Sequence, residues 1–476
     1  MLFTSLEFLL LFFPIVFGVN FLLPRKLKNY WLLLASLCFY AWGEPMFVLI
    51  MIGSIIGNYL LALWLNALRD KPAGKKAVLV LDLVLNLGLL FVFKYLNFLT
   101  ANLHAWFPAT ESLFPVTKIA LPIGISFFTF QALSYVIDVY RGDVPAQKNI
   151  GYLGLYISLF PQLIAGPIVR YSTVMDQITE RKVTLQSFSE GMMRFMIGFN
   201  KKVLLANVLA EVADKAFART SASAGLAWLG ALCYALQILF DFSGYSDMAI
   251  GLGRMLGFRF LENFDYPYCS GSISEFWRRW HISLGTWFRD YVYFPLGGSR
   301  VGKGKLVRNL LIVWLLTGIW HGANWTFILW GLLYGFVIMI EKLTGLSKKL
   351  KDWHAAPRVL YRVLTLLLIL LGWVLFRADD LPAAGRYYLA MLGQTGNAVI
   401  GNDFIFYSRE YIVYLIAALV ACTPLVRIVR KAIAARKPNL AATADVVGWV
   451  VQAMLFVVSI TMLVMNAHNP FIYFNF

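Results

Sequence analysis

Two histidines combine the residue type and the surroundings that acid–base chemistry needs. His321 lies in the sequence TGIWHGAN at residues 317–324, and His281 lies in the sequence WRRWHISLG at residues 277–285. A neutral imidazole can accept a proton near pH 7, so either side chain could act as a general base. The alternative is a packing histidine bonded to a backbone carbonyl, and the residues alone leave both interpretations open for His321.

The surroundings of His321 are apolar over an unusual length. Residues 306–342 carry only three charged side chains, all near the two ends of the stretch. The stretch is much longer than the roughly 20 residues that one membrane span needs. Polar groups are costly at such depth and indicate function. We therefore predict a catalytic role for His321, with Trp320 and Asn324 as substrate contacts that could donate a hydrogen bond to an oxyanion.

The segment around His281 is amphipathic. On a continuous helix His281 would share one face with the apolar residues Trp277, Trp280, Leu284 and Phe288. Arg278 and Arg279 would then point to water or to lipid headgroups. One interpretation is a helix that lies on the membrane surface. The other is the cytoplasmic mouth of a cavity whose floor carries His321, where the two arginines would attract an anionic substrate.

A third polar group lies at the end of an apolar run, in the sequence FDFSGYSD at residues 240–247. Polar residues in a membrane span usually face the interior of the helix bundle. Two interpretations stay open here. The residues either line a wet cavity, which would make Asp247 a substrate contact, or form paired structural groups.

Metal and cofactor chemistry lacks support in the sequence. No zinc-ligand spacing, P-loop, dinucleotide fingerprint or nucleophile elbow is present. The four cysteines are scattered and include no C-x-x-C pair, so we predict neither a disulfide framework nor a metal site. We expect the other three histidines, His104, His354 and His468, to be solvated or interfacial.

The composition indicates a polytopic membrane protein. Hydrophobic residues make up 60% of the 476 residues and charged residues 14%, against about 25% charged residues in soluble proteins. Apolar runs of spanning length recur from end to end, so we predict one all-α integral-membrane domain, residues 1–476, in a lipid bilayer. The formal net charge is +17. Its basic residues cluster in short loops, which the positive-inside rule explains without a nucleic-acid partner.

The basic loops also predict a topology. The loops at residues 25–28 and 69–76 flank one hairpin and are expected in the cytoplasm, with the N-terminus outside. Two segments are expected to be re-entrant: residues 151–168, which prolines and a glycine interrupt, and residues 306–342, which would turn near Gly318–Gly322. The ten predicted crossings are residues 1–24, 30–43, 46–68, 77–98, 118–140, 184–212, 224–250, 363–376, 411–426 and 446–466. The stretches between the later crossings are predicted as a cytoplasmic segment at 251–308, an outer segment at 377–410 and a basic inner loop at 427–437.

These motifs carry a resemblance to a known family. The matching segments are FPQLIAGPIVRY at 160–171, FDFSGYSDMAIGLGRMLGF at 240–258, FWRRWHISLGTWFRDYVYFPLGGSR at 276–300, TGIWHGANWTFILWGLLYG at 317–335, GWVLFRA at 372–378 and NPFIYFNF at 469–476. The chain resembles the membrane-bound O-acyltransferase (MBOAT) family over essentially its whole length, and is most similar to the bacterial alginate O-acetylation (AlgI-like) branch. In this resemblance His321 matches the near-invariant histidine of the family and His281 matches its second histidine. Gln162 stands where some relatives have a histidine, so that histidine is not required here.

The resemblance implies a ring of about ten transmembrane helices with re-entrant segments around a central funnel. It also implies transfer of an acyl group, acetyl in this branch, from a cytoplasmic thioester to an extracellular or periplasmic polysaccharide such as alginate. His321 would be the general base, and His281 would orient the donor or relay a proton. The implied donor is acetyl-CoA or another acyl thioester, with no bound cofactor. The implied partner is an exported acetyltransferase of the serine-esterase type, and the implied location is the bacterial inner (plasma) membrane.

Three alternatives stay open. D-alanyl transfer to teichoic acid would use the same fold with a carrier-protein thioester. A polysaccharide or lipid transporter would need related halves with paired broken helices, which the sequence lacks. A non-catalytic scaffold for a secretion complex would not depend on His321.

Overall fold

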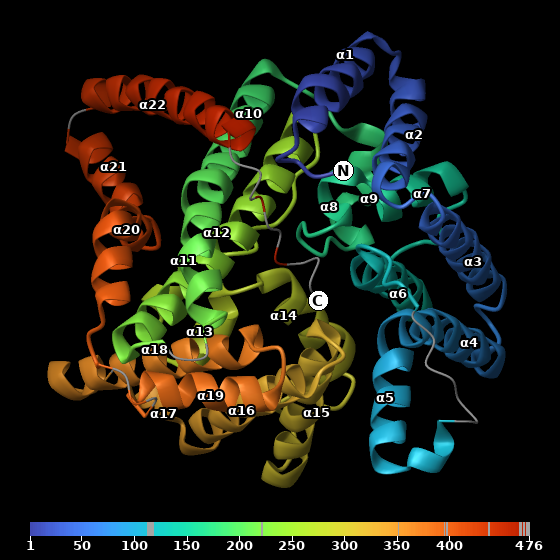
Figure 1. Ribbon diagram of the computed structural model, residues 1–476. Coiled ribbons are helices and arrows are strands. Elements are labelled where there is room, and N and C mark those ends of the chain that lie inside the picture. The colour runs from blue at the N-terminus through green and yellow to red at the C-terminus, as the bar shows by residue number, and fades with distance from the viewer. Residues whose placement is uncertain are drawn as a thin grey trace. The chain divides into compact units, whose positions relative to one another are not determined.

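The computed structural model describes the chain except for residues 112–118, 220, 221, 351, 395, 397, 437, 466–468, 470, 471 and 473–476. The side chains of residues 348, 438, 439, 441 and 442 are also outside this description. His468 and most of the terminal NPFIYFNF sequence therefore lie outside the described residues. Throughout the described ranges the regular structure is helical (Figure 1), as predicted.

The contacts divide the chain into two compact units. The first unit comprises residues 1–195 and 248–261, and the second comprises residues 196–247 and 262–476. Two helices, α10 (Leu185–Asn200) and α12 (Ala224–Met255), contribute residues to both units. The single domain expected for residues 1–476 stays a prediction.

The first unit contains nine α-helices among its described residues, of which α5 and α9 were not among the predicted segments. They are α1 (Phe13–Leu22), α2 (Arg25–Gly43), α3 (Phe47–Ala67), α4 (Pro72–Leu90), α5 (Leu96–Trp106), α6 (Ile125–Arg141), α7 (Ile150–Ser158), α8 (Phe160–Leu163) and α9 (Tyr171–Glu180). The predicted interruption of residues 151–168 is confirmed, since α7 ends at Ser158 and α8 has only four residues. Within it, Nε2 of Gln162 donates to the carbonyl oxygen of Tyr156 at 2.6 Å, so Gln162 braces the broken backbone.

The second unit contains the predicted site and the remaining helices. They are α11 (Asn207–Phe217), α13 (Ile273–Arg279), α14 (Ile282–Phe288), α15 (Lys303–His321), α16 (Trp325–Thr344), α17 (Leu346–Lys349), α18 (Ala355–Arg377), α19 (Leu381–Met391), α20 (Asn402–Ala421), α21 (Leu425–Arg436) and α22 (Pro438–Met465). Buried small residues of α12, Ala227 and Ala231, pack against Val374 of α18 and Tyr387 of α19. Tyr387 also donates to the carbonyl oxygen of Ala227 at 2.8 Å. Because α18 also packs against α16, this packing supports the hairpin that carries His321.

The chain is a multi-pass membrane protein. Seven helices of the described residues are long and apolar enough to cross a bilayer: Phe47–Ala67, Pro72–Trp106, Ala224–Met255, Trp325–Thr344, Ala355–Arg377, Asn402–Ala421 and Thr443–Met465. The apolar segment Phe8–Leu22 is shorter. The most apolar part of α22 is only 6% buried, as expected for a helix that faces lipid. The count of ten crossings stays a prediction.

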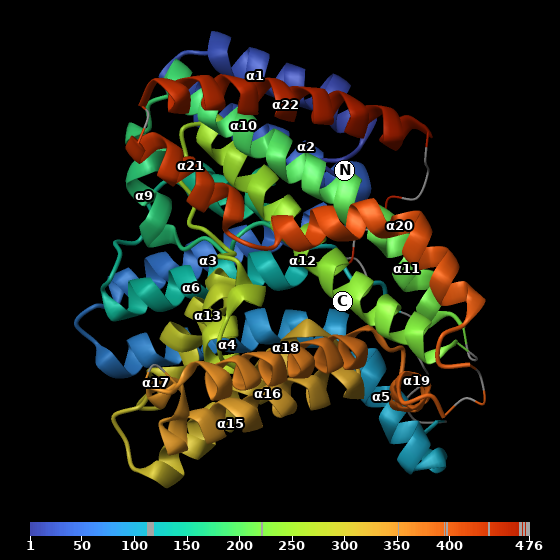
Figure 2. The ribbon, with the colours of Figure 1, turned by 90° about the vertical axis from the view of Figure 1, so that its left-hand side faces the viewer.

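Three predicted basic loops are wholly or partly helical. Residues 25–28 begin α2, and residues 72–76 of the predicted loop 69–76 begin α4. Residues 427–437 were predicted as a basic inner loop, but most of them belong to the helix α21 (Figure 2). The reason is that apolar residues recur between the basic ones at helical spacing, with Leu425, Val429 and Ile433 on one face. The other boundary changes are smaller: α18 begins eight residues before the predicted span 363–376, and α19 lies within the predicted outer segment.

Candidate active site

A tight helical hairpin carries His321. The helix α15 ends at His321, the turn occupies residues 322–324, and α16 runs back beside α15 (Figures 1 and 2). A Cβ atom at Gly318 would lie 2.5 Å from the carbonyl oxygen of Phe327, and one at Gly331 would lie 2.5 Å from that of Trp314. Only glycine permits this approach. The predicted hairpin near Gly318–Gly322 is confirmed.

Asn324 caps the second helix of this hairpin. Its Oδ1 accepts the backbone N–H of Thr326 at 3.1 Å, which satisfies one of the free donors at the helix start. Its Nδ2 donates to the carbonyl oxygen of Asp379 at 2.7 Å. Both ends of the amide are therefore engaged in holding the turn next to His321.

His321 lies among aromatic rings. Its side chain is 5% exposed, and its ring centroid lies 5.0 Å from that of Trp320, 5.0 Å from that of Trp330 and 5.3 Å from that of Phe376. Such surroundings have a low effective dielectric constant and strengthen the electrostatic interactions of a reacting group.

The continuous helix expected around His281 is wrong. The helix α13 ends at Arg279 and α14 begins at Ile282, while His281 itself has φ 45° and ψ 54°. This left-handed conformation is strained for a residue that has a Cβ atom, and such strain concentrates at functional sites. The break is stabilised by the backbone N–H of Ile282, which donates to the carbonyl oxygen of Asn263 at 3.0 Å.

The side chain of Asn263 determines which ring nitrogen of His281 carries the proton. Its Oδ1 accepts the backbone N–H of Ser283 at 3.1 Å and the Ser283 hydroxyl at 2.9 Å, and lies 3.2 Å from Nδ1 of His281. A backbone N–H can only donate, so the Asn263 atom that faces it is the oxygen. Nδ1 must then carry the proton that it donates to this oxygen, and Nε2 carries the lone pair. In the described part of the chain Nε2 has no hydrogen-bond partner.

Burial keeps the imidazole of His281 neutral. The side chain is 2% exposed, and burial lowers the pKa of His281 to about 3. Sequence reasoning missed Asn263, because it lies 18 residues before His281 in a loop without a distinctive motif.

Trp320 connects the two histidines. Its ring centroid lies 5.9 Å from that of His281 and 5.0 Å from that of His321. The cluster continues through Trp330 to Trp277, whose ring centroids lie 5.2 Å apart. The structure therefore brings His281, Trp320 and His321 into one aromatic cluster.

A cavity of about 990 Å³ opens beside His281, a size typical of small-molecule sites. Its apolar wall is formed by Trp277, Trp280, Ile282, Leu284, Phe288, Leu310, Val313, Trp314 and Ile338. Its polar and charged lining comprises Ser274, Arg278, His281, Thr286, Arg289, Tyr293, Thr317, Glu341, Lys342 and Ser347. Two residues of the predicted site, Arg278 and His281, are in this lining. The other five lie in the described part of the chain but outside this lining: Asp247, Arg279, Trp320, His321 and Asn324. The arrangement is that of an aromatic cavity whose lining includes the cationic residues Arg278, Arg289 and Lys342 and one neutral imidazole.

The chain is similar to known proteins over most or all of its length. Residues 148–376, which include both histidines, match the model of the membrane-bound O-acyltransferase family. A probable alginate O-acetylase of Pseudomonas putida is 43% identical over 100% of both chains. One from Pseudomonas syringae pathovar tomato is 49% identical over 82% of this chain and 75% of the relative. A peptidoglycan O-acetyltransferase of Helicobacter pylori is 37% identical over 83% and 80% of the two chains.

The chain belongs to the membrane-bound O-acyltransferase family. It is an O-acyltransferase, and the helical multi-pass fold is that of the family.

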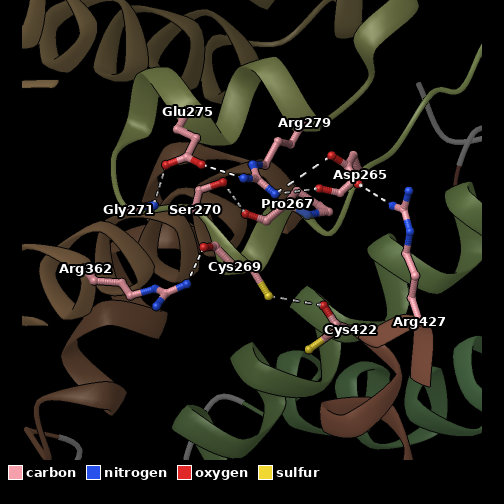
Figure 3. Close-up of polar contacts among 10 residues, drawn as sticks. All are labelled: Asp265, Pro267, Cys269, Ser270, Gly271, Glu275, Arg279, Arg362, Cys422 and Arg427. Atoms are coloured by element: carbon pink, nitrogen blue, oxygen red, sulfur yellow. Dashed lines mark hydrogen bonds and ion pairs between the residues drawn. The ribbon is translucent and has the colours of Figure 1, made fainter. Parts of the chain in front are cut away.

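Two predicted substrate contacts of the acyltransferase are ion-paired elsewhere. Arg279 pairs with Glu275 at 2.7 Å and with Asp265 at 3.9 Å (Figure 3). Asp247 of α12 pairs with Lys201 at 2.8 Å. The geometry favours the paired structural interpretation for Asp247, and a contact of either residue with substrate stays a prediction.

A buried carboxylate that sequence reasoning missed holds the helix before His281. Glu341 of α16 is 1% exposed and accepts the backbone N–H groups of Ile273 and Ser274 at 2.9 and 2.8 Å. It also accepts the hydroxyl of Tyr361 at 2.7 Å. Because an anion at a helix N-terminus is stabilised by the free N–H groups and by the helix dipole, Glu341 fixes α13 and with it the wall of the cavity.

Proposed function

We propose that this acyltransferase moves an acetyl group from a cytoplasmic thioester across the bacterial plasma membrane for O-acetylation of an exported or envelope polysaccharide. The observation that carries this proposal is the full-length similarity to a probable alginate O-acetylase. The similarity to a peptidoglycan O-acetyltransferase supports an acceptor with sugar hydroxyls. The cavity supports a donor that is both partly apolar and anionic.

The donor enters the cavity with its thioester at the wall formed by His281. His321 does not line the cavity itself and is reached from this wall through Trp320. Acetyl-CoA and acyl-carrier thioesters share a phosphorylated pantetheine arm, whose phosphate suits the cationic side chains of Arg278, Arg289 and Lys342. Arg289 is partly neutralised by Asp290 at 2.7 Å, and Arg278 is exposed. The lone pair on Nε2 of His281 accepts a hydrogen bond from an amide N–H of the arm. In this role His281 orients the donor.

His321 acts as the general base. It takes the proton of the acceptor hydroxyl as the oxygen attacks the thioester carbonyl carbon, which forms the new C–O bond. The carbon–sulfur bond then breaks, and the thiolate that leaves takes the proton from the imidazolium. We assign the oxyanion donor to Trp320 rather than Asn324, because Trp320 contacts both imidazole rings and the amide of Asn324 is engaged at both ends.

The acceptor side requires a partner. An exported acetyltransferase of the serine-esterase type would receive the acetyl group as a serine ester and pass it to the polysaccharide. Thioester donors are absent outside the cell. A serine ester can still pass its acetyl group to a sugar hydroxyl there, because this step exchanges one oxygen ester for another.

The test replaces His321 by alanine. Loss of the general base is expected to lower the rate of acetyl transfer by a factor of about 10² to 10⁴. The measurement is transfer from radiolabelled acetyl-CoA or an acetylated carrier protein by the purified chain in nanodiscs. His354→Ala removes an exposed histidine far along the chain and serves as the matched control, with unchanged transfer. A folded His321→Ala protein with wild-type transfer would refute the assignment, and transfer of D-alanyl but not acetyl groups would select the alternative donor class.

A further inference from the structure

The helix α21 is an uncovered amphipathic helix between two candidate membrane spans. It begins four residues after α20 ends at Ala421, and the spanning part of α22 starts at Thr443. Figure 2 shows α21 linking these two helices. A segment that joins the end of one span to the beginning of the next lies where the membrane meets water. The position of α21 in the chain therefore places it at the bilayer surface.

The two faces of α21 differ in chemistry. The helix carries four basic residues and no acidic one. Arg427, Arg430 and Lys431 recur at helical spacing on one face, and Leu425 and Val429 lie on the opposite face. This pattern is that of a helix that lies in a membrane surface with its basic face toward the headgroups.

The apolar face of α21 is open. Leu425 is 50% exposed, Val426 69%, Ile428 57% and Val429 48%, and none of the twelve residues is buried. A helix of this length is marginal in water by itself. Something outside the described residues must therefore cover the apolar face, and acyl chains next to two lipid-facing spans are available to do so.

The charges of α21 indicate which kind of lipid headgroup this helix binds. Among the described residues neither Lys431 nor Arg436 forms an ion pair, while Arg430 pairs with Asp445 at 2.8 Å and Arg427 pairs loosely with Asp265 at 3.9 Å. We propose that α21 is a membrane-surface helix that binds anionic phospholipid headgroups through Arg427, Arg430 and Lys431.

The same helix is connected to the candidate active site. Figure 3 shows Asp265 between Arg427 and Arg279, and Arg279 paired in turn with Glu275 of α13. The thiol of Cys269 also lies 3.8 Å from the carbonyl oxygen of Cys422, just before α21.

The loop of residues 262–272 that receives these contacts also carries Asn263, which determines which ring nitrogen of His281 carries the proton. Resting on the proposed function, the inference is that anionic lipid on α21 supports the acyl-transfer geometry of this loop.

The first experiment measures insertion of α21 without reference to activity. An environment-sensitive fluorophore is attached at Val426→Cys, in a chain whose four native cysteines are replaced by serine. The protein is placed in nanodiscs of phosphatidylcholine alone or with about one third phosphatidylglycerol. We expect a blue-shifted emission that is larger with phosphatidylglycerol and reduced by 0.5 M salt, since salt screens headgroup attraction. Equal emission in both lipids would overturn the proposal.

The second experiment locates the headgroup site. Each cationic side chain contributes a factor of about five to binding of an anionic surface, so Arg430→Gln with Lys431→Gln should weaken binding of labelled phosphatidylglycerol roughly 25-fold. Lys71→Gln with Lys76→Gln removes the same charge from another basic loop and is expected to leave the effect of phosphatidylglycerol in place. An equal loss of phosphatidylglycerol binding in both double variants would show that only the overall charge attracts the lipid. This result would overturn the assignment of the headgroup site to α21.

Acetyl transfer in the same nanodiscs separates the two proposals. We expect phosphatidylglycerol to raise transfer by the wild-type chain and by Lys71→Gln/Lys76→Gln, but not by Arg430→Gln/Lys431→Gln. A fluorophore that responds to phosphatidylglycerol in a chain without any acetyl transfer would support lipid binding and contradict the proposed function. Transfer that is indifferent to phosphatidylglycerol would overturn the link to the active site.

Discussion

At the scale of single residues, a neighbour decides which ring nitrogen of His281 carries the proton. The Oδ1 atom of Asn263 receives two donors from Ser283 and lies beside Nδ1 of His281. Burial adds to this control, because it lowers the pKa of His281 to about 3. Down to about this pH the ring therefore presents the lone pair of Nε2.

Asn263→Asp tests this control. A carboxylate at position 263 keeps the acceptor for Nδ1–H but adds a negative charge that favours the imidazolium. The pKa of His281 should rise by about one to three units. Because the protonated ring has no lone pair, the acidic limb of the pH profile of kcat/KM should move to higher pH.

Asn263→Ala provides the comparison. This variant removes the acceptor and frees both tautomers of His281, so we expect KM for the donor to rise at every pH without a shift of the acidic limb. Identical pH profiles for wild type and Asn263→Asp would contradict the assignment of His281 to the donor site.

The sequence could predict His321 but not Asn263, and the reason is physical. An imidazole inside a long uncharged stretch is costly wherever the chain goes, so His321 is conspicuous before any fold is known. Asn263 matters only through a contact over 18 residues that two short helices and a left-handed residue create. No periodic pattern encodes such a contact.

At the scale of elements, the hairpin α15–α16 depends on the absence of side chains at its crossing. A Cβ atom at Gly318 would lie 2.5 Å from the carbonyl oxygen of Phe327, which is part of the backbone and cannot turn away. Trp320 and His321 follow within one turn. Separation of the two helices would therefore also displace the aromatic cluster.

Gly318→Ala measures this dependence. Overpacking of a tight contact costs about 1–3 kcal/mol of unfolding free energy, so the thermal midpoint in detergent should fall and acetyl transfer should decrease with it. Gly304→Ala lies in the same helix with nothing within 4 Å of the added Cβ atom, and should leave both quantities unchanged. Equal midpoints for the two variants would indicate that the hairpin tolerates separation.

The sequence predicted element boundaries correctly where glycine and proline mark them. The hairpin turn and the interrupted segment at residues 151–168 were predicted from such residues and are confirmed. The continuous helix through His281 was wrong because the break is stabilised by Asn263 from another segment. The helix α21 was missed because its basic residues suggested a loop, although its apolar residues recur with a helical period.

At the scale of the whole molecule, composition decides most of the architecture. Charged residues make up only 14% of the chain, which indicates that the protein folds in a lipid bilayer. Seven helices of the described residues are long and apolar enough to span it. The positive-inside rule then assigns sides to the loops. The sequence cannot predict the cavity, because its lining comes from α13 to α17 and from the segment Arg289–Tyr293, which must first pack together.

Two engineered cysteines test on which side of the membrane two predicted segments lie. In a chain without native cysteines, Gln394→Cys lies in the predicted outer segment and Lys305→Cys in the predicted cytoplasmic segment, and both positions are exposed. A membrane-impermeant maleimide should label position 394 in intact spheroplasts, and should label position 305 only after the membrane is opened. The reverse pattern would invert the topology and with it the side from which the donor enters.

The tryptophans around the cavity have a practical consequence. Trp277, Trp280 and Trp314 line a space of about 990 Å³ whose lining also includes Arg278, Arg289 and Lys342. A flat molecule with an acidic group would therefore have both stacking surfaces and a counter-charge. The cavity thus contains its own fluorophores, and quenching of their emission would report occupancy directly. Inhibitors of envelope acetylation could then be screened by tryptophan fluorescence on the unlabelled protein, without a supply of the polysaccharide.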